Sequence, residues 1–402
     1  MSHQTSFDIA ILGGGMVGAT LACALADSDL QVAIIDPKHV DQADFSGLFD
    51  LRVSAITRGS QRIFENLQVW PAMQKAGVSA FRHMQVWQQD GRGEMSFDCA
   101  DLSESHLGHI IENRVIVASL YERLAKLENV TLLLGQRCHQ LQLQDKQWQL
   151  QLDNGEYQTT LLVGADGSQS WLRQQRGIMT RGWDYDQAAL VTYVKTALSH
   201  QETAWQRFLA TGPLAFLPLK NGYSSIVWST QPQQAQALQQ MDETAFVERL
   251  AEAIEHKLGR VESVGPRAVY PLRFLMAERY IDQQLALVGD AAHTIHPLAG
   301  QGVNLGIFDA ASLAQVIKTA KQQHQPFYSE KVLRSYERWR KSENMSMLVM
   351  VDQIQRLYSQ EFGLVKWLRG LGMDMVNHLP LLKHQIIDVA MGNRGDLPHL
   401  AQ

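Results

Sequence analysis

Three glycines near the start of the chain have the spacing of a phosphate-binding turn. Gly13-x-Gly15-x-x-Gly18 follows an apolar run and precedes a helix-like segment. In that context the first glycine permits a tight turn, the second lets a pyrophosphate approach the backbone, and the third allows close packing of helix on strand. Asp36 ends the next apolar run, where a carboxylate accepts hydrogen bonds from a ribose 2′-hydroxyl. We therefore predict a dinucleotide site for FAD or NAD, and the motif alone leaves that choice open.

Two further turns place an aspartate directly after a strand-like run. One is Asp166-Gly167 and the other is Gly289-Asp290. A carboxylate that ends a strand beside small residues can reach the sugar-alcohol chain of a flavin. Each aspartate taken singly is equally well explained as a helix N-cap. Their order after the first glycine motif favours FAD.

The order of these segments resembles that of the FAD-dependent aromatic hydroxylases, the fold group of p-hydroxybenzoate hydroxylase. Residues 296–306, HPLAGQGVNLG, followed by Asp309, look like the signature of the ubiquinone-biosynthesis hydroxylases of the UbiH, UbiF and VisC (UbiI) type. The resemblance extends over nearly the whole chain. Residues 105–109 and 390–392 are most similar to the UbiI (VisC) branch.

This resemblance implies an NAD(P)H- and O2-dependent flavin monooxygenase. In the family the nicotinamide reduces FAD, O2 then forms a flavin C4a-hydroperoxide, and the distal oxygen passes to an electron-rich phenol ring. The implied substrate is a polyprenylated phenol of ubiquinone biosynthesis, and the implied reaction is that of 2-polyprenylphenol 6-hydroxylase. NADPH is the expected donor, with NADH as the alternative. Hydroxylation at a UbiF- or UbiH-type ring position, or a non-enzymatic prenyl-binding carrier with a flavin fold, are the competing hypotheses.

The same resemblance assigns cofactor contacts in the second glycine-rich segment. The N–H groups of residues 298–304 would face the pyrimidine edge of the flavin and stabilise the negative charge of the reduced ring. Glycines at 300 and 302 let the backbone approach, because a Cβ there would push the ring away. A glycine-rich helix start without a ligand is the structural alternative. The expected flavin contacts here are Gly300, Gln301, Gly302, Val303 and Asn304.

Arg52, His296 and Pro297 are the catalytic candidates. Arg52 resembles the arginine that bridges the cofactor and substrate domains, with a surface ion pair as the alternative. The family suggests that the Pro297 carbonyl lies near the transferred hydroxyl. Asn113 aligns with a polar flavin contact, which Arg114 could supply instead.

We expect no metal site. His293 and His296 form an H-x-x-H pair, but they lie in a turn and no third ligand is evident. Histidine is the commonest general base near neutral pH, yet the sequence does not identify the group that deprotonates the phenol.

The elements that position these residues predict an α/β fold. A Rossmann-like FAD-binding domain is expected over residues 1–182, with a hairpin at 81–99 that joins the substrate sheet. An antiparallel β-sheet substrate domain is inserted at 183–275, the chain returns to the FAD-binding domain at 276–325, and a helical region covers 326–402. The candidates to line the substrate pocket, each with core packing as the alternative, are Trp183, Tyr185, Phe216, Pro218 and Trp228.

Composition and charge limit the classes of partner and the cellular compartment that we expect for this chain. The 402 residues carry 36 Lys and Arg against 41 Asp and Glu, a net charge of −5 that argues against nucleic-acid binding. Cys23, Cys99 and Cys138 have no CxxC spacing, so neither a disulfide framework nor a thiolate metal site is expected. With no signal peptide or membrane-spanning run, we expect a cytoplasmic homo-oligomer. Peripheral contact with the inner membrane or with other ubiquinone-biosynthesis proteins is left open. The apolar stretch 362–391 either makes such a contact or packs on the domain as an ordinary amphipathic face.

Overall fold

The computed structural model describes residues 5–39, 48–89, 93–294, 301–359, 379, 383, 388 and 391–402. Its first lobe is built on a seven-stranded sheet in the order β8-β2-β1-β11-β10-β9, with β18 paired to the end of β11. Strands β8, β2, β1, β11 and β18 run parallel, whereas β9 and β10 are antiparallel. The bounds are β1 (Thr5–Leu12), β2 (Val32–Asp36), β8 (Val130–Leu134), β9 (Cys138–Gln144), β10 (Gln147–Leu152), β11 (Gly155–Gly164) and β18 (Leu285–Leu287).

The parallel strands are buried because helices cover them. Ile9, Ile11 and Ile34 have no exposed surface, as expected for apolar runs in a parallel sheet. Helix α1 packs against α4 and α8, and α9 packs against α8. The described helices of this lobe are α1 (Met16–Ala24), α4 (Asn113–Leu124), α5 (Trp171–Gln175), α8 (Gln301–Gln322) and α9 (Glu330–Ser359).

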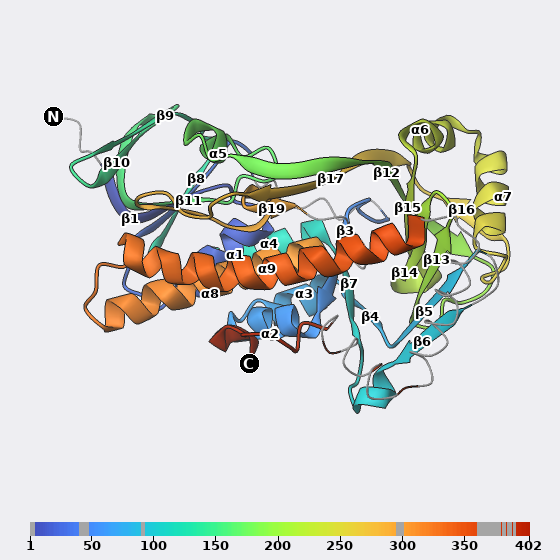
Figure 1. Cartoon of the computed structure of the whole chain (residues 1–402). Helices are drawn as coiled ribbons and strands as arrows, with labels where there is room; N and C mark the ends of the chain where they lie inside the picture. The colour runs from blue at the N-terminus through green and yellow to red at the C-terminus, as the bar shows by residue number, and fades with distance from the viewer. Residues whose placement is uncertain are drawn as a thin grey trace.

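A nine-stranded sheet forms the second lobe, in the order β19-β17-β12-β15-β14-β13-β5-β6, with β16 paired to β12. The bounds are β5 (His83–Gln88), β6 (Glu94–Asp98), β12 (Thr180–Thr196), β13 (Thr203–Leu209), β14 (Gly212–Pro218), β15 (Tyr223–Thr230), β16 (Val261–Val264), β17 (Ala268–Ala277) and β19 (His293–Thr294). The long strands β12 and β17 run between the two lobes (Figure 1). The predicted fold class is confirmed, with one difference: β13 and β5 are parallel, an arrangement that is open to strands joined by a long connection and closed to those of a tight hairpin.

Successive side chains of each strand point to opposite faces of this sheet. Phe216 and Trp228 lie in a buried apolar cluster with Phe246 of α7, so their prediction as pocket residues is wrong. Tyr193 lies on the opposite face, since it alternates with Val194 of that cluster. The covering helices are α6 (Pro232–Gln240) and α7 (Glu243–Ala253).

A third, three-stranded sheet was not predicted. It consists of β3 (Val53–Thr57), β7 (Gly108–Glu112) and β4 (Ser79–Phe81). Helices α2 (Arg58–Asn66) and α3 (Trp70–Ala76) lie between β3 and β4 along the chain. Short 3-10 turns occupy Cys99–Leu102, Lys220–Gly222, Gly289–Ala291 and His399–Ala401. The three cysteines are buried and free. Within the described ranges, no helix is both long and apolar enough to span a bilayer.

Candidate cofactor site

The three turns singled out in the sequence follow three neighbouring parallel strands. Gly13 follows β1, Asp166 follows β11 and Gly289 follows β18. Backbone hydrogen bonds join them in pairs, from Ala165 N to Leu12 O at 2.8 Å and from Val288 N to Gly164 O at 3.0 Å. Because the carboxyl ends of parallel strands share one edge of a sheet, the turns lie side by side there.

The glycines of the first turn show three different environments. A Cβ at Gly13, which has φ +106°, would lie 2.3 Å from Ala165 O, and one at Gly18 would lie 2.0 Å from Gly13 O. A Cβ at Gly15 would meet no described atom within 4 Å. Gly15 also begins α1 without a side-chain cap. Gly13 and Gly18 therefore serve the fold, whereas Gly15 leaves an open approach to the first N–H groups of the helix.

Asp36 holds the first turn from the end of β2. Its Oδ2 accepts a hydrogen bond from Gly14 N at 2.7 Å, and its Oδ1 accepts one from Lys38 N at 2.8 Å. On the other side, the Tyr121 hydroxyl donates to Gly14 O at 2.9 Å, and burial raises the pKa of this phenol. The Asp36 carboxylate is thereby fixed beside the glycine turn, where its remaining lone pairs suit a ribose hydroxyl.

The two oxygens of the Asp166 carboxylate differ in their hydrogen bonding. Its Oδ2 accepts a hydrogen bond from Leu172 N at 3.0 Å and so caps the start of α5. Its Oδ1 is buried and has no hydrogen-bond partner among the described residues. A buried oxygen without a partner is costly unless a ligand satisfies it. Gly167, at φ +82°, turns the chain here, and a Cβ on it would meet no described atom within 4 Å.

Arg173 connects the second turn to the third, which the sequence analysis missed. This buried side chain donates from Nη1 to Ala291 O at 2.8 Å and from Nη2 to Ser168 O at 2.7 Å. An isolated arginine in a short helix carries no local pattern that would reveal such a link. Its fork of donors fixes the spacing of the two aspartate turns.

Asp290 and Arg52 are brought together although they are far apart in the sequence. The Asp290 side chain is exposed, yet the surrounding protein desolvates it and raises the pKa of its carboxyl. The positive charges of His293 and Arg52 act in the opposite direction. A carboxylate that solvent can reach, but that is surrounded by many protein atoms, is suited to binding a hydroxyl-bearing ligand.

A set of hydrogen bonds fixes the backbone around Arg52. Arg52 N donates to Asp50 Oδ1 at 3.1 Å, and Asn113 N donates to Arg52 O at 2.9 Å. The Asn113 Oδ1 atom accepts from Ser54 Oγ at 2.7 Å. The alternative flavin contact, Arg114, pairs with Glu112 at 2.7 Å.

The first turns of helix α8 pack against the Gly13–Gly18 motif and against the Gly289–Asp290 turn. A Cβ at Gly306 would lie 2.7 Å from Val17 Cγ2 and 3.1 Å from Gly289 Cα. The Asn304 side chain, only 2% exposed, accepts from Thr57 N at 3.0 Å and donates to Ala55 O at 2.8 Å. This side chain therefore holds β3, and any flavin contact by Asn304 would use its backbone.

The structure describes only some of the other predicted site residues within 296–303. Gly302 and Val303 lie in the first turn of α8 and are partly buried. Gln301 begins the helix, although its side chain is outside the described set. His296, Pro297 and Gly300 lie outside the described residues, so their roles stay predictions.

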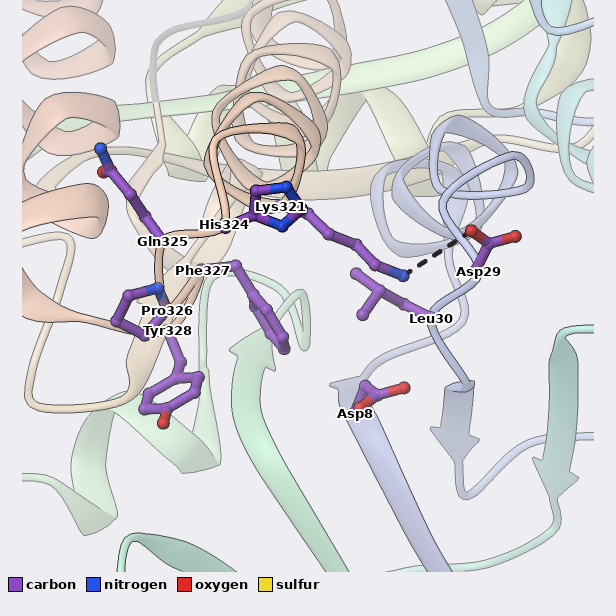
Figure 2. A pocket seen from close by; sticks show the side chains of 9 residues that line it. All are labelled: Asp8, Asp29, Leu30, Lys321, His324, Gln325, Pro326, Phe327 and Tyr328. Carbon is purple, nitrogen blue, oxygen red and sulfur yellow. Dashed lines mark ion pairs between the residues drawn. The ribbon is translucent and has the colours of Figure 1, made fainter.

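The pocket in Figure 2 is not this site. It lies between the loop after α8, with Phe327 and Tyr328, and the segment that contains Asp29 and Leu30. Asp8 and Leu30 lie near the amino ends of β1 and β2, the edge of the sheet opposite to the three turns. The turns, with their open glycine and unpartnered carboxylate oxygen, are where the chemistry of a dinucleotide fits.

The chain matches known proteins along most of its length. Residues 6–348 match the family model described as an FAD binding domain. The 3-demethoxyubiquinol 3-hydroxylase of Escherichia coli (strain K12) is 34% identical, covering 98% of this chain and 100% of the relative. The mitochondrial ubiquinone biosynthesis monooxygenase COQ6 of Homo sapiens is 34% identical, covering 97% and 93%. The chain belongs to the FAD-dependent hydroxylases of ubiquinone biosynthesis.

Solved structures agree with the fold of this hydroxylase. The p-nitrophenol 4-monooxygenase PnpA from Pseudomonas putida DLL-E4 has a TM-score of 0.79 at 17% identity, covering 98% of this chain and 100% of that one. PqsL of P. aeruginosa, in complex with 2-aminobenzoylacetate, has a TM-score of 0.76 at 21% identity, covering 89% and 97%. The family assignment makes FAD the cofactor and the protein an enzyme, so the carrier hypothesis is set aside.

Replacing Asp290 with alanine in this hydroxylase should weaken FAD binding by about 10- to 100-fold, because the accessible carboxylate would no longer accept hydrogen bonds from the cofactor. Titration of the apoprotein with FAD, followed by flavin fluorescence, measures this change. Asp290→Asn, which keeps an acceptor oxygen, should lose less affinity. Full flavin content and unchanged affinity in Asp290→Ala would remove this residue from the site.

His106 and His109 make the stability of this hydroxylase sensitive to acid. Burial, and after it the nearby Arg58 guanidinium, lowers the pKa of His106 to about 4, and burial together with His106 and Arg58 lowers the pKa of His109 to about 3. Below about pH 6.5 the unfolded chain binds protons that the folded protein does not. The free energy of unfolding should therefore fall between pH 6.5 and 4, by up to about 1.4 kcal/mol per pH unit for the buried His109 and less for the partly exposed His106.

Urea unfolding of the apoprotein at pH 7.5 and at pH 5 tests this prediction. His109→Phe keeps an aromatic ring beside Trp70, 4.9 Å away between ring centroids, and should reduce the loss of stability. His256→Asn, at an exposed residue with φ +53°, is the control and should behave as wild type. An equal loss in His109→Phe and wild type would contradict the prediction.

Proposed function

We propose that this hydroxylase adds oxygen to the ring of a polyprenylated phenol as a 2-polyprenylphenol 6-hydroxylase, with NADPH as the electron donor. The side-by-side arrangement of the three cofactor turns, in a member of this family, supports the oxygen-transfer reaction. Relatives named for hydroxylation in ubiquinone biosynthesis support the substrate class.

The ring position is supported by two segments that lie together at the substrate sheet. Leu107, from the stretch most similar to the UbiI branch, and Met391, from the similar C-terminal stretch, share one buried apolar cluster. Phe208 of β13 belongs to the same cluster. In addition, Gly59 N donates to Met391 O at 3.1 Å. The branch-like segments thus pack together against β13 of the substrate sheet.

Bound FAD would supply the redox and oxygen-transfer chemistry. The open backbone at Gly15 and the first N–H groups of α1 would bind its pyrophosphate, and Asp36 would hold the ribose. The N-terminal end of α8, whose dipole is positive, would favour negative charge on the reduced ring. The Pro297 carbonyl and His296 stay candidates for contacts near the transferred oxygen.

The substrate would lie between these turns and the sheet face that carries Tyr193. Phe49 lies 5.5 Å from Tyr193 and 5.3 Å from Tyr223, measured between ring centroids. These contacts anchor the segment before Arg52 on the substrate sheet. Arg52 would therefore stand between cofactor and phenol, where its positive charge favours a deprotonated phenol oxygen.

Expression in bacterial strains that each lack one ring hydroxylase tests the ring position. The protein should restore ubiquinone synthesis in the strain that lacks the 6-hydroxylase and leave the others deficient, with products identified by mass spectrometry. Restoration only of a strain that lacks another ring hydroxylase would assign that position instead. With purified enzyme, NADPH should give at least about 10-fold higher kcat/KM than NADH, a difference of about 1.4 kcal/mol.

A further inference from the structure

A buried polar network joins helix α9 to the Gly289–Asp290 turn. Asp309 and Asn344 have no exposed surface, His293 is 1% exposed and Arg340 is 3% exposed. Nothing in the function described so far uses Asp309, Arg340 or Asn344. Charged groups that are buried this completely must be paired, and removing one partner is costly.

The two oxygens of the Asp309 carboxylate face different elements. Oδ1 accepts hydrogen bonds from Arg340 Nε at 2.9 Å and from Asn344 Nδ2 at 3.1 Å, both on α9. Oδ2 accepts from Gly289 N at 3.0 Å and contacts His293 Nε2 at 2.5 Å. Burial raises the pKa of this carboxyl, but His293 and Arg340 outweigh it and the pKa is about 2. The ionised carboxylate only accepts, so His293 Nε2 carries the donated proton.

These contacts fix both ends of a cofactor segment. Gly289 has φ +59°, and its N–H is the one that Asp309 holds. His293 lies four residues later in β19, where it pairs with Met276 of β17. Asp290, the exposed carboxylate of the site, lies between these two anchors. Its direction is therefore set by a charge on α8 that α9 in turn holds in place.

We infer that Asp309, with Arg340 behind it, is a positioning residue that sets FAD affinity by fixing the Gly289–His293 segment. This inference rests on FAD binding at the three turns. It assigns helix α9 a part in cofactor binding that was not expected from the sequence. The alternative is that the network contributes only to the stability of the fold.

Asp309→Asn separates these two possibilities because it keeps the size of the side chain. An amide offers one acceptor oxygen and one donating NH2 group. If the oxygen faces Arg340 and Asn344, the NH2 group faces the donors Gly289 N–H and His293, so the turn loses its anchor while the link to α9 remains. The matched control is Tyr336→Phe, which removes a buried 2.8 Å hydrogen bond from α9 to Leu287 O without touching the turn.

The experiment measures two quantities on each apoprotein: the Kd for FAD from flavin fluorescence and the Tm without FAD. Asp309→Asn should raise the Kd by about 30-fold or more, as expected for loss of an ionic anchor. Tyr336→Phe should change the Kd by less than about 3-fold, although both variants lower the Tm. Equal Kd values for the two variants would overturn the inference.

A second pair of variants keeps the test valid if Asp309→Asn does not fold. His293→Asn is too short to reach Asp309 and should raise the Kd by about 5- to 10-fold. His293→Gln places an NH2 group near the position of Nε2 and should restore the Kd to within about 2-fold of wild type. Equal affinity in His293→Asn and wild type would also overturn the inference. Failure of the wild-type apoprotein to bind FAD is a different result and would overturn the cofactor site itself.

Discussion

Replacing Gly15 with valine should greatly weaken FAD binding while the apoprotein stays folded and loses only about 1 kcal/mol of stability, because valine is a poorer helix N-cap than glycine. A side chain at Gly15 would meet no described atom of the protein within 4 Å, and the backbone there has φ −68° and ψ −172°, which valine tolerates. The added methyl groups would instead occupy the approach to the first N–H groups of α1. We expect the Kd for FAD to rise by about 100-fold or more, equivalent to about 2.7 kcal/mol.

Gly18→Ala is the matched control in the same motif and should have the opposite profile. Its Cβ would lie 2.0 Å from Gly13 O, so the backbone must move and the apoprotein should lose about 2–4 kcal/mol of stability. Thermal unfolding of both apoproteins, together with FAD titration of Gly15→Val, checks the pair. Normal FAD affinity in Gly15→Val would show that the cofactor does not approach this turn.

Asn304→Leu should destabilise the apoprotein about as strongly as Gly18→Ala does. The Asn304 side chain serves Thr57 N and Ala55 O, and leucine would leave both of these backbone groups without a partner. Each such group costs about 1–3 kcal/mol when buried, so we expect a loss of about 2–4 kcal/mol in the free energy of unfolding. Urea titration of the apoprotein measures it.

Asn66→Ala provides the control for this prediction. The Asn66 side chain is exposed and donates one hydrogen bond to Leu400 O at 2.9 Å, so its removal should cost less than about 1 kcal/mol. If Asn304→Leu were as stable as Asn66→Ala but bound FAD weakly, the Asn304 side chain would belong to the cofactor rather than to β3.

The parts of the site that depend on neighbouring residues were predictable. The roles of Gly13, Gly15 and Gly18 follow from a strand, a turn and a helix that are continuous in the sequence. The aspartate turns were recognisable because each follows an apolar run that forms a parallel strand. Their side-by-side position then follows from the sheet order, in which β1, β11 and β18 are neighbours.

Contacts between segments that are far apart in the sequence produce no recognisable sequence pattern. The alternation of apolar and polar residues identified the strands that contain Phe216 and Trp228. It did not indicate which face of the sheet α6 and α7 would cover. Arg173 donates to Ala291 O and Arg340 donates to Asp309 Oδ1, which are 118 and 31 positions away in the sequence. No periodic pattern encodes such contacts. Asn304 lies in the recognised motif, yet its side chain holds a strand that the motif does not contain.

The late position of β18 in the chain has a consequence for biosynthesis. Residues 162–164 of β11 pair with residues 285–287, so that strand edge stays unpaired until about 120 more residues have left the ribosome. At about 5–20 residues per second, this interval lasts roughly 6–24 s. An unpaired apolar edge can recruit other strands during that time. The nascent chain should therefore need chaperone protection longer than its N-terminal βαβ unit would suggest, and truncation before residue 285 should yield aggregates.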